Sequence, residues 1–213
     1  MPDDSPSFKI PFEDFLAAAA SRSHVPGGGS VAAAAGALGA SMGAMVAHLT
    51  VGKEGYEVHQ KEAQELAGAF LAGMEALQRL GEADMAAYDA LASAYRLPKA
   101  NPRERLSRGV AVRAAVRRAV LVPLEIAQTA SELLELNARL ASFGNDRAVN
   151  DCGVAAVLLE AAARGAMLTA DVNLPRLDDP GMAEAVRARK EEVFTGARGI
   201  VKDTLAIVEE RRR

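Results

Sequence analysis

Three glycines and a serine, Gly27-Gly28-Gly29-Ser30, stand directly before a long apolar stretch of the sequence. Consecutive glycines let the backbone approach another group closely. The free amides at the start of a helix can hold an anionic or carbonyl group. These four residues are therefore candidate substrate-binding residues. The alternative is a flexible turn in which Ser30 caps the helix. No Gly-Lys-Ser/Thr follows at P-loop spacing, so this is not a nucleotide-binding loop.

Asp84 is the carboxylate with the strongest case for catalysis. It lies on or near the helical register of Leu77, Tyr88 and Leu91. A carboxylate near an apolar face can have a raised pKa and act as a general acid or base. Asp89, five positions later, does not share that face. The alternative for Asp84 is a solvated residue at the edge of the face.

Two further polar residues, Asn150 and Asp151, precede an almost wholly apolar segment. We expect Asn145 or Asp146 to cap the helix that contains them. An amide and a carboxylate at the mouth of a buried segment suit the binding of a polar heterocycle. The alternative is an acidic first turn that the helix dipole favours.

Metal and nucleophile chemistry have little support in this sequence. The histidines are too isolated for metal-ligand spacing, and the single cysteine, Cys152, lies far from all three. We therefore expect no metal site, no internal disulfide and no acyl-enzyme chemistry. A basic stretch is interpreted as a solvated face, with the binding of a polyanionic tail as the alternative. Its members are Arg103, Arg105, Arg108, Arg113, Arg117 and Arg118.

The elements that must position these residues are all helical. Apolar residues recur at helical spacing along nearly the whole chain, and no stretch alternates as a strand does. The pattern predicts a single all-α domain, residues 1–213, folded as an antiparallel, up-and-down helical bundle of long helices. Expected helices are a short one opening at Phe12, then 30–50, 57–95 with a soft point at Gly81, 102–143 kinked near Pro123, 146–168, and 180–213.

The predicted second helix is rich in small residues, including Gly36, Gly39, Ala40 and Gly43. Glycine inside a helix costs roughly 1 kcal/mol relative to alanine. Its repeated use here therefore indicates unusually close packing, either inside the bundle or across a subunit interface.

Composition excludes several classes of partner. The 213 residues carry a net charge of −3, which gives no general attraction to nucleic acid or to an anionic membrane. Residues 31–51 come closest to a membrane span, but their glycines and serines favour a buried helix. The first four residues, Met1-Pro2-Asp3-Asp4, hold no basic segment, so we expect no secretory signal and a cytoplasmic protein.

Four blocks of this sequence occur in an order and spacing that resemble the cyclodeaminase/cyclohydrolase family of folate enzymes. They are "VPGGGSVAAAAGALGASMGAMVAHLTVGKEGYE", "DMAAYDALASAYRLPK", "VPLEIAQTASELLEL" and "GNDRAVNDCGVAAVLLEAAARGAMLTADVNL". The resemblance covers about residues 12–209. It implies an all-helical fold, a homodimer and a folate substrate.

The resemblance also implies roles for particular residues. Asp84 matches the aspartate of the family's D-x-x-A-[YF] block, regarded there as the catalytic acid/base. The Gly27–Ser30 loop matches the glycine-rich folate site, Lys53 the basic residue after the second helix, and Asp151 the aspartate of an S-D-x-G-V-A block. This chain departs from that block at Asn150, where the family commonly has serine.

The expected activity is hydrolysis of 5,10-methenyltetrahydrofolate to 10-formyltetrahydrofolate. Asp84 would move protons, and Lys53 would orient the substrate or stabilise an oxyanion. No cofactor beyond the tetrahydrofolate substrate is expected, because the cationic substrate is already an electrophile. The alternatives are formimidoyltetrahydrofolate cyclodeaminase activity with ammonia release, or a folate-binding or dimerisation module without catalysis.

Overall fold

A computed structural model describes residues 8–212 of the chain, and helices but no strands occur within that range. The expectation about the first four residues concerns a segment outside the described residues. The helices are α1 (Phe12–Ala19), α2 (Gly28–Thr50), α3 (Gln60–Arg96), α4 (Pro102–Phe143), α5 (Val149–Asn173) and α6 (Pro180–Arg211), with 3₁₀ turns η1 (Glu57–His59) and η2 (Leu174–Arg176).

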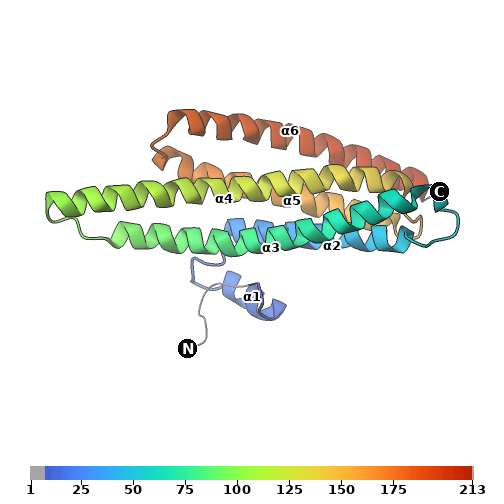
Figure 1. Cartoon of the computed structure of the whole chain (residues 1–213), viewed down its shortest axis with the longest axis horizontal. Helices are drawn as coiled ribbons and strands as arrows, with labels where there is room; N and C mark the ends of the chain where they lie inside the picture. The colour runs from blue at the N-terminus through green and yellow to red at the C-terminus, as the bar shows by residue number, and fades with distance from the viewer. Residues whose placement is uncertain (1–7, 213) are drawn as a thin grey trace.

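Four long helices form the body of the bundle. α2 packs against α3 and α5, and α4 packs against the same two helices, so consecutive helices are antiparallel neighbours. α6 lies outside this body against α4 and α5, and α1 sits apart below it (Figure 1). Phe70, Leu77, Leu134 and Leu159 are fully buried in the core. The predicted all-α, up-and-down bundle is confirmed.

Most helices start and end near the capping residues, prolines and glycines of the sequence. α4 begins at Pro102 after an N-cap at Asn101, whose side chain accepts a hydrogen bond from the Glu104 amide. α6 begins in the same way after Asp179. α4 runs unbroken past the buried Pro123 to Phe143. The expected kink there stays a prediction.

The start of α2 differs from the prediction. The N-cap is Gly27, and Ser30 is the third helical residue instead of the cap. The Ser30 hydroxyl accepts a hydrogen bond from the Gly27 amide at 3.1 Å, which satisfies a donor that precedes the helix. The Ser30 amide lies in the first turn, where no carbonyl of the helix accepts from it, and Gly27 has no side chain to cap it, so it can donate elsewhere.

α5 begins at Val149, three residues after the predicted start, and ends at Asn173 instead of near residue 168. Neither Asn145 nor Asp146 caps it. The Asn145 side chain instead donates to the Leu49 carbonyl at 2.7 Å, and Asp146 forms an ion pair with Arg211. The two residues therefore tie the loop to α2 and α6, a long-range use that spacing along the chain does not reveal.

α3 also differs in detail, because it is one unbroken helix from Gln60 to Arg96. Gly81 is not a weak point: it is buried against the ring of Phe8 and the methyl group of Ala33. The expected soft point at Gly81 therefore corresponds to no break in the helix.

The glycines of α2 serve packing inside the bundle. A Cβ on Gly36 would lie 3.0 Å from a Leu77 methyl group, one on Gly39 would lie 2.9 Å from Leu159, and one on Gly43 would lie 2.6 Å from the Phe70 ring. Of the two explanations left open by the sequence, close approach within the bundle therefore holds for these three glycines.

α2 and the segment Val149–Arg176 are long and apolar enough to cross a bilayer by length and composition. About half of each apolar window, 56% and 50%, is buried among the other helices. Core helices of a bundle have this same character. The exposed remainder forms an apolar face on the outside of α2 and α5.

Candidate active site

A cavity of about 800 Å³ lies between α3 and α5, beside the start of α2. The glycine loop forms one wall, the second half of α3 another, and the end of α5 a third. Residues that line it include His24, Gly27, Gly28, Gly29, Asp84, Tyr88, Leu91, Tyr95, Leu168, Thr169, Val172, Asn173 and Arg176. The structure thus brings Asp84 and the predicted glycine loop into one site.

Asp84 is held against the first turn of α2 by Ser30. Its Oδ2 accepts a hydrogen bond from the Ser30 amide at 2.9 Å and another from the Ser30 hydroxyl at 3.2 Å. Within residues 8–212 no hydrogen bond is recorded to Oδ1. One carboxylate oxygen is therefore fixed by the fold, and the other keeps its capacity to exchange a proton.

The position of the Asp84 carboxylate leaves no space for a side chain at residue 29, so glycine is required there. A Cβ at Gly29 would lie 2.6 Å from Oδ2 of Asp84, well inside normal contact distance. A Cβ at Gly28 would lie 3.2 Å from Thr169 Oγ1, which is tight but much less so. At Gly29 the group that approaches the backbone closely is therefore a side chain of the protein itself, and the expected binding of a folate by the glycine loop stays a prediction.

Burial raises the pKa of the Asp84 carboxyl above its ordinary value, and the two hydrogen bonds from Ser30 oppose this effect only in part. Asp84 is half-buried, whereas Asp89 is exposed. A carboxyl whose pKa is raised in a cavity is suited to accept a proton from water and return it. Asp84 therefore has the environment of a general acid/base.

The walls beyond Asp84 are largely apolar and aromatic. The imidazole of His24 and the ring of Tyr88 lie with centroids 5.5 Å apart at a 34° tilt. Tyr88, Leu91 and Tyr95 follow Asp84 along one face of α3. Such surfaces suit a flat aromatic ligand.

The other predicted site residues lie at the opposite end of the bundle. Lys53 follows the end of α2, about 35 Å from Gly29 at 1.5 Å per residue. Asn150 and Asp151 lie in the first turn of α5, about 27 Å along that helix from Thr169. One chain does not bring these three residues to Asp84.

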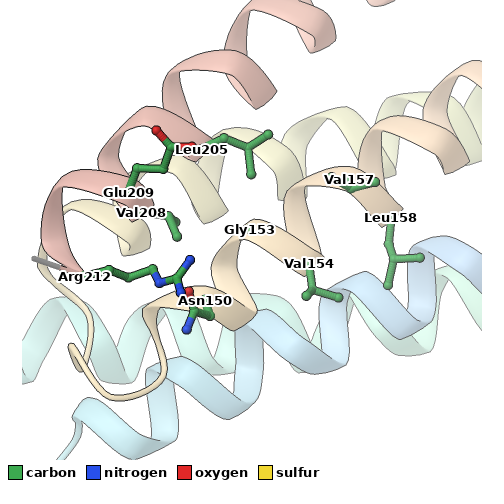
Figure 2. Close-up of a pocket in the computed structure, with 9 residues that line it drawn as sticks. All are labelled: Asn150, Gly153, Val154, Val157, Leu158, Leu205, Val208, Glu209 and Arg212. Atoms are coloured by element: carbon green, nitrogen blue, oxygen red, sulfur yellow. The ribbon is translucent and has the colours of Figure 1, made fainter.

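A second cavity, of about 490 Å³, lies at that opposite end between α5 and α6. It is lined by Asn150, Val154, Val157, Leu205 and other residues of the two helices (Figure 2). The Arg212 side chain extends from the end of α6 toward Asn150 (Figure 2). Asn150 therefore borders a cavity, but a different one from that of Asp84.

Comparison with known proteins decides the family. Residues 11–192 match the formiminotransferase-cyclodeaminase family. The chain belongs to this family. The identification as a relative of cyclodeaminases and cyclohydrolases is confirmed.

Members of the formiminotransferase-cyclodeaminase family similar to this chain differ in length. This chain is 34% identical, over the whole of its own length, to formimidoyltransferase-cyclodeaminase of Rattus norvegicus. It spans only 40% of that relative. It is 34% identical to methenyltetrahydrofolate cyclohydrolase of Methylorubrum extorquens, with 81% of this chain and 83% of the relative covered.

A solved structure in the same family has the same fold. Formiminotetrahydrofolate cyclodeaminase from Thermotoga maritima superposes with a TM-score of 0.84 at 25% identity, covering 95% of this chain and 97% of that one. The bundle is therefore the family's architecture over nearly its whole length.

Three polar residues of this family member's cavity were not anticipated: Thr169, Asn173 and Arg176. The helix expected over 146–168 ends before all three, whereas α5 runs to Asn173 and η2 to Arg176. Their spacing of four and three positions was the available signal, because it places them on one helical face. The apolar neighbours Leu168 and Val172 make this polar face harder to recognise in the sequence.

His24 lines this cavity, whereas Cys152, His48 and His59 do not. Burial raises the pKa of the Cys152 thiol to about 12, so it is a poor nucleophile. No group of three His, Cys, Asp or Glu residues in the described part of the chain is arranged to bind a metal ion.

Proposed function

We propose that this protein hydrolyses 5,10-methenyltetrahydrofolate to 10-formyltetrahydrofolate, with Asp84 as the general acid/base. The observation that carries the proposal is the Asp84 carboxyl, anchored through one oxygen inside a cavity and raised in pKa by burial. The Methylorubrum extorquens relative, a methenyltetrahydrofolate cyclohydrolase, supports the choice of reaction because this chain covers most of its length.

The reaction needs one base and one acid at the same carbon. Water attacks the carbon that bridges N5 and N10, and the carboxylate of Asp84 takes a proton from the attacking water. The tetrahedral intermediate then collapses: the bond to N5 breaks, Asp84 returns a proton to that nitrogen, and the hydroxyl proton leaves to solvent as the formyl carbonyl forms. The substrate's amidinium is already electrophilic, so the proposal assigns no metal or additional cofactor. A negative carboxylate also stabilises the cation before attack.

The alternative activity is cyclodeamination of formimidoyltetrahydrofolate. There the folate nitrogen attacks the formimino carbon, ammonia leaves, and the same aspartate transfers the protons. The Rattus norvegicus and Thermotoga maritima relatives favour it, since both names include cyclodeaminase. A binding module without catalysis is the remaining alternative.

Two assays on the purified chain separate these functions. The first follows loss of the methenyl chromophore, corrected for the spontaneous rate. The second measures ammonia released from the formimino substrate. Enzyme-dependent turnover in the first assay supports hydrolysis, turnover in the second supports deamination, and folate binding without turnover in either contradicts both catalytic proposals.

We further propose that the protein acts as an antiparallel homodimer joined through the apolar face of α2 and α5. That face consists of Val31, Leu38 and Leu49 on α2 with Val154, Val157 and Leu168 on α5, each more than 40% exposed in the single chain. α2 carries no Asp, Glu, Lys or Arg between Gly28 and Thr50. Such an uncharged exposed face is typical of an interface between subunits.

The two cavities support an antiparallel arrangement. One borders α5 at Leu168 and Val172 and the other at Val154 and Val157, so they flank Ala163 at similar distances along the helix. A two-fold axis near the middle of α5 would bring each cavity of one subunit toward the opposite cavity of its partner.

In this arrangement, the partner's Lys53 and the partner's Asn150 and Asp151 approach the Asp84 cavity. The proposal thereby joins two groups of predicted site residues that one chain keeps far apart. Lys53 would stabilise the oxyanion that develops as the hydroxyl of the tetrahedral intermediate loses its proton.

A further inference from the structure

The cavity that contains Asp84 has a simple distribution of charge. Among the described residues that line it, Asp84 is the one anion and Arg176 is the one Lys or Arg. The remaining lining residues are apolar, aromatic or neutral polar groups. The two charged side chains come from different helical elements, α3 and η2.

Arg176 lies farther from the glycine loop than Asp84 does. Thr169 is level with the first turn of α2, because its Oγ1 would be 3.2 Å from a Cβ on Gly28. Arg176 follows Thr169 by seven residues, about 10 Å along a helix. Asp84 contacts the same first turn of α2 through Ser30. The carboxylate and the guanidinium therefore mark two ends of the cavity.

The guanidinium of Arg176 is available to a ligand. Its Nη1 donates to the carbonyl of Val172, four residues earlier, at 3.1 Å. Within residues 8–212 no carboxylate lies within ion-pair distance of it, and Asp179, three residues later, pairs with Arg117. An arginine has five donors, so most of them remain for an anion.

The wall between the two ends is apolar. Leu91 from α3 with Leu168 and Val172 from α5 lie along it, and Tyr88 and Tyr95 border it. Asn173 adds an amide on the same face as Arg176, where its Nδ2 donates to the Ala119 carbonyl at 3.3 Å. An uncharged aromatic spacer fits this stretch better than a charged one does.

We propose that Arg176 binds the glutamate carboxylate of the folate and so fixes which way the substrate lies in the cavity. The inference rests on the proposed function. A methenylfolate has a cationic amidinium near its middle, a benzoyl ring beyond it and carboxylates at its end. With the amidinium beside Asp84, the carboxylates reach toward Arg176 and both charges are matched. In the reverse direction the carboxylates lie beside Asp84 and the amidinium lies beside Arg176, so both contacts with the charged groups of this chain are repulsive.

The test compares two substrates, 5,10-methenyltetrahydrofolate and an analogue without any carboxylate, 5,10-methenyltetrahydropteroyl methylamide, in which an N-methyl amide replaces the glutamate. Arg176→Gln should raise KM for the first by about tenfold, the size expected for loss of one charge-assisted contact. It should leave kcat nearly unchanged, and KM for the analogue should stay at the wild-type value. Arg176→Lys should recover part of the loss, because it restores the charge but not the fork geometry.

Arg187→Gln on α6 is the matched control, because Arg187 is exposed and pairs only with Glu184 on its own helix in the described residues. It should change neither KM. An equal rise in KM for both substrates, or no rise for either, overturns the role of Arg176. If the wild-type protein turns over neither substrate, the proposed function falls, and this inference falls with it.

Discussion

The Asp84 carboxyl gains its properties from a small number of contacts with the first turn of α2. Burial raises its pKa, while the Ser30 amide and hydroxyl favour the charged form. The raised pKa shows that burial is the larger effect. Holding this charge therefore costs folding free energy, as is common where a side chain is arranged for catalysis.

We predict that Asp84→Asn lowers turnover by about 10²–10⁴-fold, the usual contribution of a general acid/base. Asparagine retains an oxygen that can accept from the Ser30 amide, so binding of folate should change much less. Steady-state turnover and folate binding check this result. Turnover within a few-fold of the wild type would mean that Asp84 is not catalytic.

The same variant should not destabilise the protein at neutral pH. A raised pKa means that the folded state binds the Asp84 proton more tightly than the unfolded chain does. Tighter proton binding by the folded state stabilises the wild-type protein below the ordinary aspartate pKa of about 3.9. This stabilisation is lost as the pH rises through the raised pKa of Asp84 in the folded protein. The stability of Asp84→Asn relative to wild type should thus be greatest near neutral pH and decline toward pH 4, as measured by chemical denaturation.

We predict that Ser30→Ala moves the acidic limb of the kcat/KM profile to higher pH. The hydroxyl of Ser30 lowers the pKa of Asp84, so its removal raises that pKa, and a larger fraction of Asp84 is protonated at a given acidic pH. Ser41→Ala is the control, since its hydroxyl bonds only to the Leu38 carbonyl among the described residues. A limb that stays in place would show that another group titrates there.

We predict that Gly29→Ala reduces activity far more than Gly28→Ala. The new methyl group at Gly29 would displace the Asp84 carboxylate, whereas at Gly28 it would need only a small shift of Thr169. Neither glycine has a positive φ, so alanine is compatible with the backbone at both positions. Turnover of the two variants, compared at equal folded fraction, gives the result. Equal effects would contradict a specific role for the space above Gly29.

Helix α2 is the element around which the bundle closes, because it packs against α3 on one side and α5 on another. Small residues let these neighbours come close, and large side chains from the neighbours fill the space. Its N-terminal turn positions Asp84, so the packing of this helix and the geometry of the site are coupled. Changes along α2 should affect both.

We predict opposite stability effects from two glycine-to-alanine changes. Gly43→Ala on α2 should lower the free energy of unfolding by about 1–3 kcal/mol, because its Cβ would lie 2.6 Å from the Phe70 ring in a filled core. Gly68→Ala on α3 meets no atom within 4 Å and should raise it by up to about 1 kcal/mol. Urea denaturation of both variants measures the difference, and a stabilised Gly43→Ala would show that the core there is loose.

The complete molecule leaves a long apolar face on α2 and α5 and has cavities near both ends of that face. A homodimer would cover this surface and would also unite the two groups of site residues. The proposal thus links assembly with activity, and the link can be tested by breaking the interface at a distance from Asp84.

We predict that Leu38→Glu converts the protein to a 22.3-kDa monomer that keeps its helical content but loses activity. Leu38 is 49% exposed in the single chain and lies midway along α2, where a charge would be buried against the partner. Leu106→Glu on α4, at a residue 69% exposed, is the control and should remain dimeric. Sedimentation and turnover measure the two effects.

Mixing inactive subunits tests the partner's contribution directly. If Lys53 acts across the interface, a mixture of Asp84→Asn and Lys53→Met subunits should regain activity, because mixed dimers contain one site with both wild-type residues. No recovery after confirmed subunit exchange would place Lys53 outside the partner's site.

The sequence by itself determined the helical fold and most helix limits, and it singled out Asp84 as a candidate acid/base. Apolar spacing, prolines and capping residues act within a few positions, so they can be identified along the chain. The blocks around Gly27–Ser30 and Asp84 are enough by themselves to indicate the family.

Tertiary structure decided the contacts between distant segments. Ser30 had been predicted to cap α2, yet it binds Asp84, and Asn145 joins α2 instead of capping α5. Lys53 and Asp84 belong to neighbouring blocks, but a straight helix separates them by about 35 Å. Such outcomes depend on how whole helices pack, because rigid rods bring together residues that local spacing does not relate.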